Sequence, residues 1–154
     1  MSRRYEIPGA ATLEIEHLLL DINGTLTDRG DLIDGASELL ERIRSDLEVH
    51  LLSADTLGTL DELAHKLGVS AKRISRGREK ADFIDRLGPE ACAAIGNGRN
   101  DAEMLGLACL GIAVVGPEGA SAAALRNANV VCRSILDAID LLLDEKALAS
   151  TLRP

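Results

Sequence analysis

The chain has 154 residues, of which 46% are hydrophobic and 27% are charged, a composition typical of a globular protein with a full core. Its formal charge of −8 and its single Tyr and single Phe argue against a nucleic-acid partner, because phosphates would be repelled and bases would find no stacking surface. No apolar stretch reaches the ~20 residues that span a bilayer, so no membrane partner is expected.

The amino terminus and the cysteines indicate a cytoplasmic protein. Residues 1–4 are basic, but no apolar signal-peptide region follows them. The cysteines (Cys92, Cys109 and Cys132) are odd in number and lie in apolar stretches, as expected of reduced core thiols. Their spacing fits no Cys-x-x-Cys or Cys/His metal site.

The predicted elements begin with a hairpin, because residues 3–7 and 12–15 alternate polar and apolar side chains around Pro8-Gly9. Residues 27–33 are too short and polar for a helix and predict a small flap. From there strands and helices alternate. Strands are expected at 17–21, 47–53, 72–75, 91–95, 111–115 and 130–132. Helices are expected at 34–46, 55–67 (capped by Asp55 or Thr56), 77–87, 102–108, 117–126 and 134–143 (capped by Ser134). Residues 144–154 are expected to add one amphipathic turn or to fray.

This alternation predicts an α/β fold with a doubly wound, mostly parallel sheet of five to six strands. No linker, internal repeat or low-complexity segment interrupts it. We therefore expect a single domain over residues 1–154, with the short hairpin at its amino end.

The most informative stretch is Leu18-Leu19-Leu20-Asp21-Ile22-Asn23-Gly24-Thr25-Leu26-Thr27. Three leucines in a row favour a strand buried on both faces. Asp21 would then stand at the carboxyl end of that strand, where open α/β sheets bind ligands. Gly24 allows a sharp turn with exposed amide groups, and Thr25 adds a hydroxyl. The stretch therefore predicts an anion site beside a carboxylate, although an Asx-type turn after a strand would explain it as well.

Three more polar features follow later strands: Ser53, the basic group at Arg76, Arg78 and Lys80, and the loop Asn97–Asp101. Each alone has a structural explanation, namely a cap, a solvated helix residue and a turn. Because the carboxyl ends of parallel strands share one edge of the sheet, we expect these features to form one site with Asp21. His17, at the start of the central strand, is interpreted as a structural residue and not as a metal ligand.

These motifs resemble the haloacid dehalogenase-like superfamily over nearly the whole chain. Its first motif, Asp-x-Asp-Gly-Thr, reads Asp21-Ile22-Asn23-Gly24-Thr25 here, and its second is a Ser or Thr at the end of the next strand, here Ser53. The third is a Lys, here Lys80, with Arg76 and Arg78 as alternatives. The fourth, Gly-Asp-Gly-x-x-Asp, appears as residues 96–101.

Within that superfamily the likeness is greatest to the phosphorylation domain of P-type ATPases. These proteins also have a non-acidic residue two positions after the nucleophile, followed by Gly-Thr-Leu-Thr as in residues 24–27. Residues 51–69 and 95–115 resemble their later blocks. Yet no membrane helix is expected, and the 26 residues between Ser53 and Lys80 leave no space for a nucleotide-binding insertion. The resemblance implies a soluble relative without a cap domain.

The resemblance also implies roles for individual residues. Asp21 would be the nucleophile that forms an aspartyl-phosphate, with Asn23 and Lys80 as the other catalytic positions. Mg²⁺ would be the cofactor. Its ligands would be Asp21, Asn23, Asn97 and Asp101, and the phosphate contacts would be Gly24, Thr25 (through its N–H), Ser53, Lys80 and Asn100.

Two positions depart from the phosphatase pattern. Asn23 stands where the superfamily has its general acid, and losing such a group costs ~10²–10⁴ in rate. Asn97 replaces a charged magnesium ligand with an amide. We therefore expect a slow magnesium-dependent phosphatase or phosphotransferase for a small phosphorylated substrate, the alternative being a phosphate-binding or scaffold module that has lost catalysis. The substrate and homo-oligomerisation are left open.

Overall fold

A computed structural model of the chain describes residues 1–54, 59–74 and 76–154. Six strands form one parallel sheet in the order β10-β9-β8-β3-β6-β7. Their bounds are β3 (His17–Asp21), β6 (Glu48–Ser53), β7 (Ser70–Arg73), β8 (Cys92–Gly96), β9 (Leu110–Val114) and β10 (Val130–Cys132). The predicted doubly wound α/β fold is confirmed. The chain winds outward from β3 in both directions, which places a topological switch point between β3 and β8.

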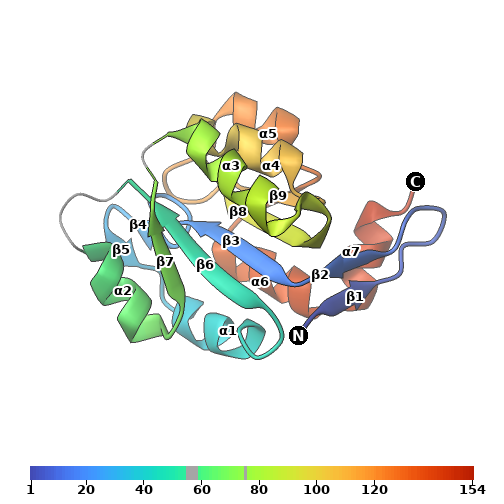
Figure 1. Ribbon diagram of the computed structural model, residues 1–154, viewed down its shortest axis with the longest axis horizontal. Helices are drawn as coiled ribbons and strands as arrows, with labels where there is room; N and C mark the ends of the chain where they lie inside the picture. Colours follow the sequence, from blue (N-terminus) through green and yellow to red (C-terminus); the bar gives the residue numbers. More distant parts are fainter. Residues whose placement is uncertain (55–58, 75) are drawn as a thin grey trace.

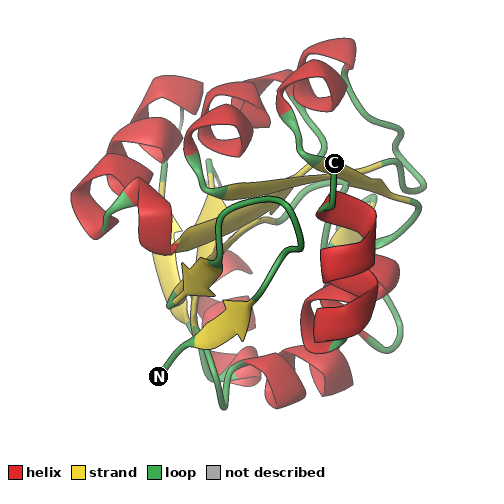
Figure 2. Cartoon of the chain, turned by 90° about the vertical axis from the view of Figure 1, so that its right-hand side faces the viewer, coloured by secondary structure: helices red, strands yellow, loops and turns green. Residues whose placement is uncertain are grey.

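Helices cover both faces of the sheet (Figures 1 and 2). One face carries α1 (Ala36–Ile43), α2 (Thr59–Leu67) and α6 (Ile135–Leu143). The other carries α3 (Gly77–Leu87), α4 (Ala102–Leu107) and α5 (Ala122–Asn127). Two short 3-10 turns, η1 (Pro89–Ala91) and η2 (Arg99–Asp101), lead into β8 and α4.

The central strand β3 is buried on both of its faces, as its leucine run predicts. Leu18 and Leu20 pack into the core beneath α1 and α6, whereas Leu19 packs into the core beneath α3 and α4. All three leucines are fully buried. Alternate side chains of a strand point to opposite faces, so a continuous apolar run is what a strand between two helical layers requires.

The predicted amino-terminal hairpin forms from β1 (Arg3–Tyr5) and β2 (Leu13–Ile15), and lies beside α7 (Glu145–Leu152) at one end of the molecule (Figures 1 and 2). The Tyr5 hydroxyl donates a 2.7 Å hydrogen bond to the Leu142 carbonyl. The carboxyl-terminal segment is more ordered than expected. Asp144 caps α7 by accepting a hydrogen bond from the Ala147 N–H, and Leu148 is fully buried beneath the helix.

Several predicted boundaries are wrong. The helix expected from residue 117 begins at Ala122, because Gly119 adopts a left-handed conformation (φ 72°) and Ser121 provides the cap. The strand expected at 72–75 runs from Ser70 to Arg73, and the first helix ends at Ile43 rather than at residue 46. The expected caps at Asp55 and Thr56, and residue Ser75, lie outside the described residues.

The predicted flap is a two-stranded hairpin of β4 (Thr27–Asp28) and β5 (Asp31–Leu32). Its turn residues Arg29 and Gly30 both have positive φ, which is the geometry of tight hairpin turns. The Arg29 N–H donates a 3.0 Å hydrogen bond to Glu118, so the flap contacts the loop that follows β9. Within the described parts of the chain, no helix combines the length and the apolar character needed to cross a membrane.

Candidate active site

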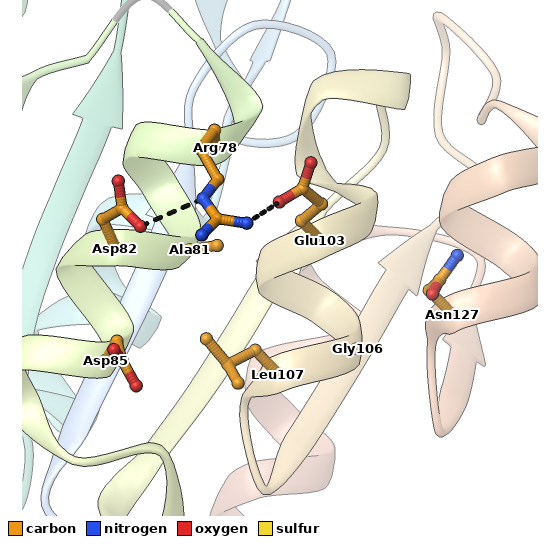
Figure 3. Close-up of a pocket in the computed structure, with 8 residues that line it drawn as sticks. All are labelled: Arg78, Ala81, Asp82, Asp85, Glu103, Gly106, Leu107 and Asn127. Atoms are coloured by element: carbon orange, nitrogen blue, oxygen red, sulfur yellow. Dashed lines mark ion pairs between the residues drawn. The ribbon is translucent and has the colours of Figure 1, made fainter.

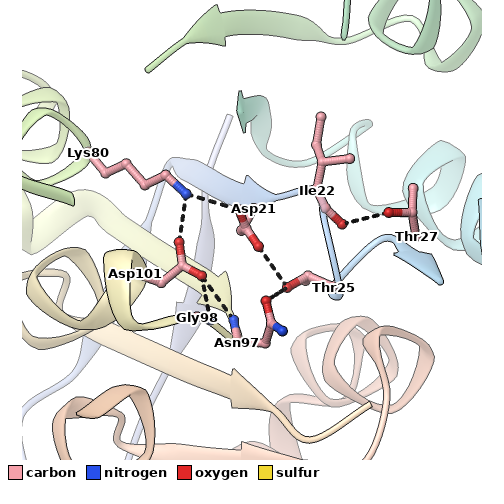
Figure 4. Close-up of polar contacts among 8 residues, drawn as sticks. All are labelled: Asp21, Ile22, Thr25, Thr27, Lys80, Asn97, Gly98 and Asp101. Atoms are coloured by element: carbon pink, nitrogen blue, oxygen red, sulfur yellow. Dashed lines mark hydrogen bonds and ion pairs between the residues drawn. The ribbon is translucent and has the colours of Figure 1, made fainter. Parts of the chain in front are cut away.

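The carboxyl ends of β3 and β8 and the first turns of α3 converge at one edge of the sheet. Asp21 is the last residue of β3, Lys80 lies in the first turns of α3, and Asp101 is in η2 after β8. Gly77 permits the close approach of α3, because a β-carbon there would lie 2.6 Å from the Asn100 carbonyl oxygen. Figure 4 shows the three side chains pointing toward one another.

Lys80 joins the two carboxylates. Its Nζ donates a 2.9 Å hydrogen bond to Asp21 Oδ1 and a 2.7 Å hydrogen bond to Asp101 Oδ1. The exposed fractions of the three side chains are 1% for Lys80, 10% for Asp21 and 0% for Asp101. One buried ammonium therefore faces two buried carboxylates, which leaves an excess of negative charge in the site.

The loop after β8 is held by Asp101. The Asn97 and Gly98 N–H groups donate to Asp101 Oδ2 at 3.0 and 2.9 Å, so both oxygens of this carboxylate accept hydrogen bonds. Asn97 is in turn fixed by the loop that follows β9: its Nδ2 donates to the Gly119 carbonyl, and the Ser121 N–H donates to the Asn97 carbonyl.

The turn after Asp21 brings Thr25 into the same cluster. The Thr25 hydroxyl lies 3.2 Å from Asp21 Oδ2 and 3.3 Å from Asn97 Oδ1. Gly24 has a φ of 77°, and a β-carbon there would collide with the Asn97 amide, so this position requires glycine. The Thr25 N–H, expected to contact phosphate, donates a 3.1 Å hydrogen bond to the Ile22 carbonyl in this structure.

Burial dominates the proton equilibrium of Asp21. Desolvation and the charge of Asp101 raise the pKa of Asp21 to about 7, and the neighbouring Lys80 offsets only part of this rise. Burial acts to lower the pKa of Lys80, but the two carboxylates outweigh it and raise that pKa above its ordinary value. The lysine therefore stays charged while Asp21 is poised to exchange a proton near neutral pH, a perturbation common at functional sites.

Arg76 and Arg78, the alternatives to Lys80, lie elsewhere. Arg78 is 77% exposed and pairs with Asp82 at 3.3 Å and Glu103 at 3.8 Å. Figure 3 shows these ion pairs at a surface pocket of about 450 Å³ between α3 and α4. Arg76 is the exposed residue that precedes α3. Of these three cations, Lys80 is the one that reaches Asp21.

The other predicted site residues lie around the cluster. Asn23 is exposed and Ser53 is buried at the end of β6; both line a cavity of about 580 Å³. The remaining walls are mainly residues of α2 and of the flap. Asn100 is exposed in η2. The sequence did not indicate Gly119 and Ser121 as supports of Asn97, because a contact between two loops leaves no local pattern.

The sequence model of the haloacid dehalogenase-like hydrolases matches residues 4–108, which include Asp21, Lys80 and Asp101. The chain belongs to this family. Sixty residues are 48% identical to an uncharacterized protein of Methanocaldococcus jannaschii, covering 39% of this chain and 64% of that protein. Ninety-four residues are 30% identical to a chloroplastic copper-transporting ATPase of Arabidopsis thaliana, covering 57% of this chain and 10% of the ATPase.

The chain thus spans less than two thirds of the length of either relative. The match to a copper-transporting ATPase agrees with the predicted likeness to P-type ATPases. The same fold occurs in 3-deoxy-D-manno-octulosonate 8-phosphate phosphatase of Moraxella catarrhalis, solved with magnesium, phosphate and KDO, with a TM-score of 0.70 at 17% identity over 90% of this chain and 94% of that one. The family therefore supports the prediction of a hydrolase, and the solved structure shows the same fold.

Proposed function

We propose that this protein cleaves activated phosphate compounds through an aspartyl-phosphate on Asp21, with magnesium bound beside that residue. The observation that supports this most directly is the Asp21–Lys80–Asp101 cluster, buried at the carboxyl edge of the sheet. Burying ions is costly and gives weak evidence for a stabilising role. A carboxylate held by a lysine at a strand end is, in contrast, well placed to act as a nucleophile.

The side chains beside Asp21 fit a magnesium ion. Asp21 Oδ2 and Asn97 Oδ1 both accept from the Thr25 hydroxyl, at 3.2 and 3.3 Å, so a carboxylate oxygen and an amide oxygen are neighbours in the site. Oxygen ligands of this kind are those that Mg²⁺ prefers, with water completing its shell. By the family resemblance, the Asn23 carbonyl would be a further ligand. When bound, the ion would offset the negative charge of the phosphoryl group and of Asp21.

We assign Asp101 mainly a positioning role. Both of its oxygens already accept hydrogen bonds, one from Lys80 and the other from two loop amides. It would thereby orient the Lys80 ammonium and, at the same time, the backbone of the loop at Asn97. Its contribution to holding magnesium would be indirect, through the loop and through water.

The reaction has two displacement steps. An oxygen of Asp21 attacks phosphorus; the new P–O bond forms as the bond to the leaving group breaks, and the electron pair departs on the leaving-group oxygen. Lys80 stays beside the reacting oxygen and offsets charge that develops in the transition state. Water then attacks the phosphorus of the aspartyl-phosphate, which yields inorganic phosphate and restores Asp21.

Asn23 sets the choice of substrate. It cannot protonate a leaving group or deprotonate water, so both steps lose a general acid–base catalyst worth ~10²–10⁴ in rate. Leaving groups that need no proton, such as the carboxylate of an acyl phosphate, would suffer least. The cavity of about 580 Å³ lined by Ile22, Asn23 and Ser53 offers space for such a group beside the turn that follows Asp21. Hydrolysis of the aspartyl-phosphate would be slow, and the phosphoenzyme would accumulate.

The test compares an acyl phosphate with an alkyl phosphate in the presence of Mg²⁺. We expect radiolabelled acetyl phosphate to label the wild type but not Asp21→Asn, and to turn over faster than an alkyl phosphate. Asn23→Asp should raise alkyl phosphate turnover by ~10²-fold or more. Asn127→Asp, the same change in α5, is the matched control and should alter neither rate. Faster cleavage of the alkyl phosphate by the wild type would refute the proposal.

The second candidate is a phosphate-binding or scaffold module without catalysis. It is favoured by the two amides, Asn23 and Asn97, at positions where the superfamily carries acids. In that case the wild type would bind phosphate or an unreactive analogue, yet no label would appear on Asp21, and Asn23→Asp would not produce turnover.

A further inference from the structure

We infer that the opposite edge of the sheet holds a second metal site, for Zn²⁺, formed by His17, Glu48 and His50. These residues lie at the amino ends of β3 and β6, whereas Asp21 lies at the carboxyl end of β3 (Figure 1). Asp21 follows His17 by four positions along the strand, or roughly 13 Å. The site is thus distinct from the one proposed for magnesium, and it does not depend on the proposed function.

The register of the sheet brings the three side chains together. His17 pairs directly with Glu48 across the β3–β6 ladder, and His50 follows Glu48 by two positions. Because strand side chains alternate between faces, all three project from the same face of the sheet, the one covered by α3. The sequence alone favoured a structural role for His17, since it gave no indication that Glu48 and His50 would be its neighbours.

The distances between the ligand atoms match a tetrahedral zinc site. His17 Nδ1 lies 3.2 Å from His50 Nε2 and 3.4 Å from Glu48 Oε2, and His50 Nε2 lies 3.8 Å from Glu48 Oε1. A tetrahedron with metal–ligand bonds of ~2.0–2.1 Å separates its ligand atoms by about 3.3–3.4 Å. Among the residues that the structure describes, no other group of three His, Cys, Asp or Glu side chains has ligand atoms this close together.

The surroundings fix the imidazoles and leave one side open. The ring of Phe83 from α3 packs edge-on against His50, with the ring centres 5.3 Å apart. The exposed fractions are 15% for His17, 8% for His50 and 57% for Glu48. Glu48 therefore faces solvent, where water can provide a fourth ligand.

The types of ligand atom indicate which ion would bind. Two imidazole nitrogens and one carboxylate favour Zn²⁺ over Mg²⁺ and Ca²⁺, which take oxygen ligands. A bound ion would cross-link the two central strands. Without one, the short distance between the rings is a hydrogen bond between His17 and His50, so the competing explanation is a purely structural pair of histidines.

Zinc titration calorimetry of the full chain distinguishes the two explanations. The protein is first stripped of metal and then supplied with excess Mg²⁺, which occupies oxygen-ligand sites. We expect one equivalent of Zn²⁺ to bind. His17→Gln and Glu48→Gln should each weaken this binding by at least ~10- to 100-fold, the range that results from losing even an outer contact to a metal ligand. His65→Gln, in the remaining and exposed histidine of α2, should bind zinc as the wild type does.

Cobalt(II) gives a second readout, because its visible spectrum reports the coordination geometry directly. Co²⁺ in a tetrahedral nitrogen site has a strong visible spectrum, which we expect for the wild type and for His65→Gln but not for His17→Gln. Glu48 is largely exposed, so Glu48→Gln should fold normally even if replacement of His50 does not. Zinc binding that is unchanged in both His17→Gln and Glu48→Gln, or absent from the wild type, overturns the inference.

Discussion

Replacing Asp21 by Asn should stabilise the metal-free protein while abolishing phosphoryl transfer. In the wild type, one buried lysine faces two buried carboxylates. The substitution removes the surplus charge and leaves Lys80 paired with Asp101. The Asn oxygen can still accept a hydrogen bond from Lys80, and the side-chain volume is nearly unchanged, so little packing is lost.

The size of the effect follows from the pKa of Asp21, which burial raises from an ordinary 3.8 to about 7. The folded protein holds this proton more tightly than the unfolded chain does. The resulting stabilisation is complete below about pH 4 and is lost as the pH rises through about 7. Each tenfold change in proton affinity corresponds to about 1.4 kcal/mol, so ionised Asp21 costs at most ~4 kcal/mol at pH 8. We expect Asp21→Asn to recover ~1–4 kcal/mol of that.

Urea unfolding in EDTA at pH 5 and pH 8 measures this difference. The gain of Asp21→Asn over the wild type should be larger at pH 8 than at pH 5. Asp85→Asn, an exposed aspartate of α3, is the control and should follow the wild type at both values. Mg²⁺ should stabilise the wild type at pH 8 more than it stabilises Asp21→Asn, because the variant lacks a ligand carboxylate. The reasoning fails if Asp21→Asn is less stable than the wild type at pH 8, or if its advantage does not depend on pH.

Three further substitutions test other parts of the structure. Lys80→Met leaves two buried carboxylates without a cation and should cost ~3–5 kcal/mol in urea unfolding at pH 8; adding Asp21→Asn should restore part of this loss, and strict additivity would argue against the ion pair. Gly24→Ala should lower phosphoenzyme formation at least tenfold and lower the free energy of unfolding by ~1 kcal/mol or more, because its β-carbon would displace Asn97. Labelling of this variant to the same extent as the wild type would contradict this. Leu148→Ala should cost ~2–5 kcal/mol because the side chain is fully buried, whereas a loss below ~1 kcal/mol would mean that α7 does not pack as described.

The sequence predicted those features that depend on local patterns. The leucine run identified β3 as the central strand, because only a strand covered on both faces combines three consecutive apolar residues with a polar terminus. The order of Asp21, Ser53, Lys80 and the 97–101 loop along the chain then indicated one site, since parallel strands present their carboxyl ends at the same edge. Likewise, Ser134 was correctly expected to cap α6, and its hydroxyl accepts a hydrogen bond from the Asp137 N–H.

What the sequence could not predict depends on contacts between distant segments. Pro117 and Glu118 are typical residues for a helix start. The backbone there instead turns at Gly119, whose carbonyl accepts a hydrogen bond from Asn97, and α5 begins only at Ala122. The sequence could not distinguish Lys80 from Arg76 and Arg78, because which of the three side chains reaches Asp21 depends on the orientation of α3. In the same way, the pairing of His17 with Glu48 follows from the strand register, which no local pattern encodes.

The two amides in the site explain how its charges can be so deeply buried. Acids at positions 23 and 97 would add two more negative charges to this part of the molecule, one of them at the exposed position 23, and Lys80 could not balance them in the metal-free protein. With Asn23 and Asn97, only Asp21 and Asp101 remain, and Lys80 bonds to both. Under the proposed function, the same two amides that would remove acid–base catalysis would also reduce the repulsion of a phosphate and of the aspartyl-phosphate. We therefore expect the proposed phosphoryl group on Asp21 to be held longer than it would be with acids at positions 23 and 97.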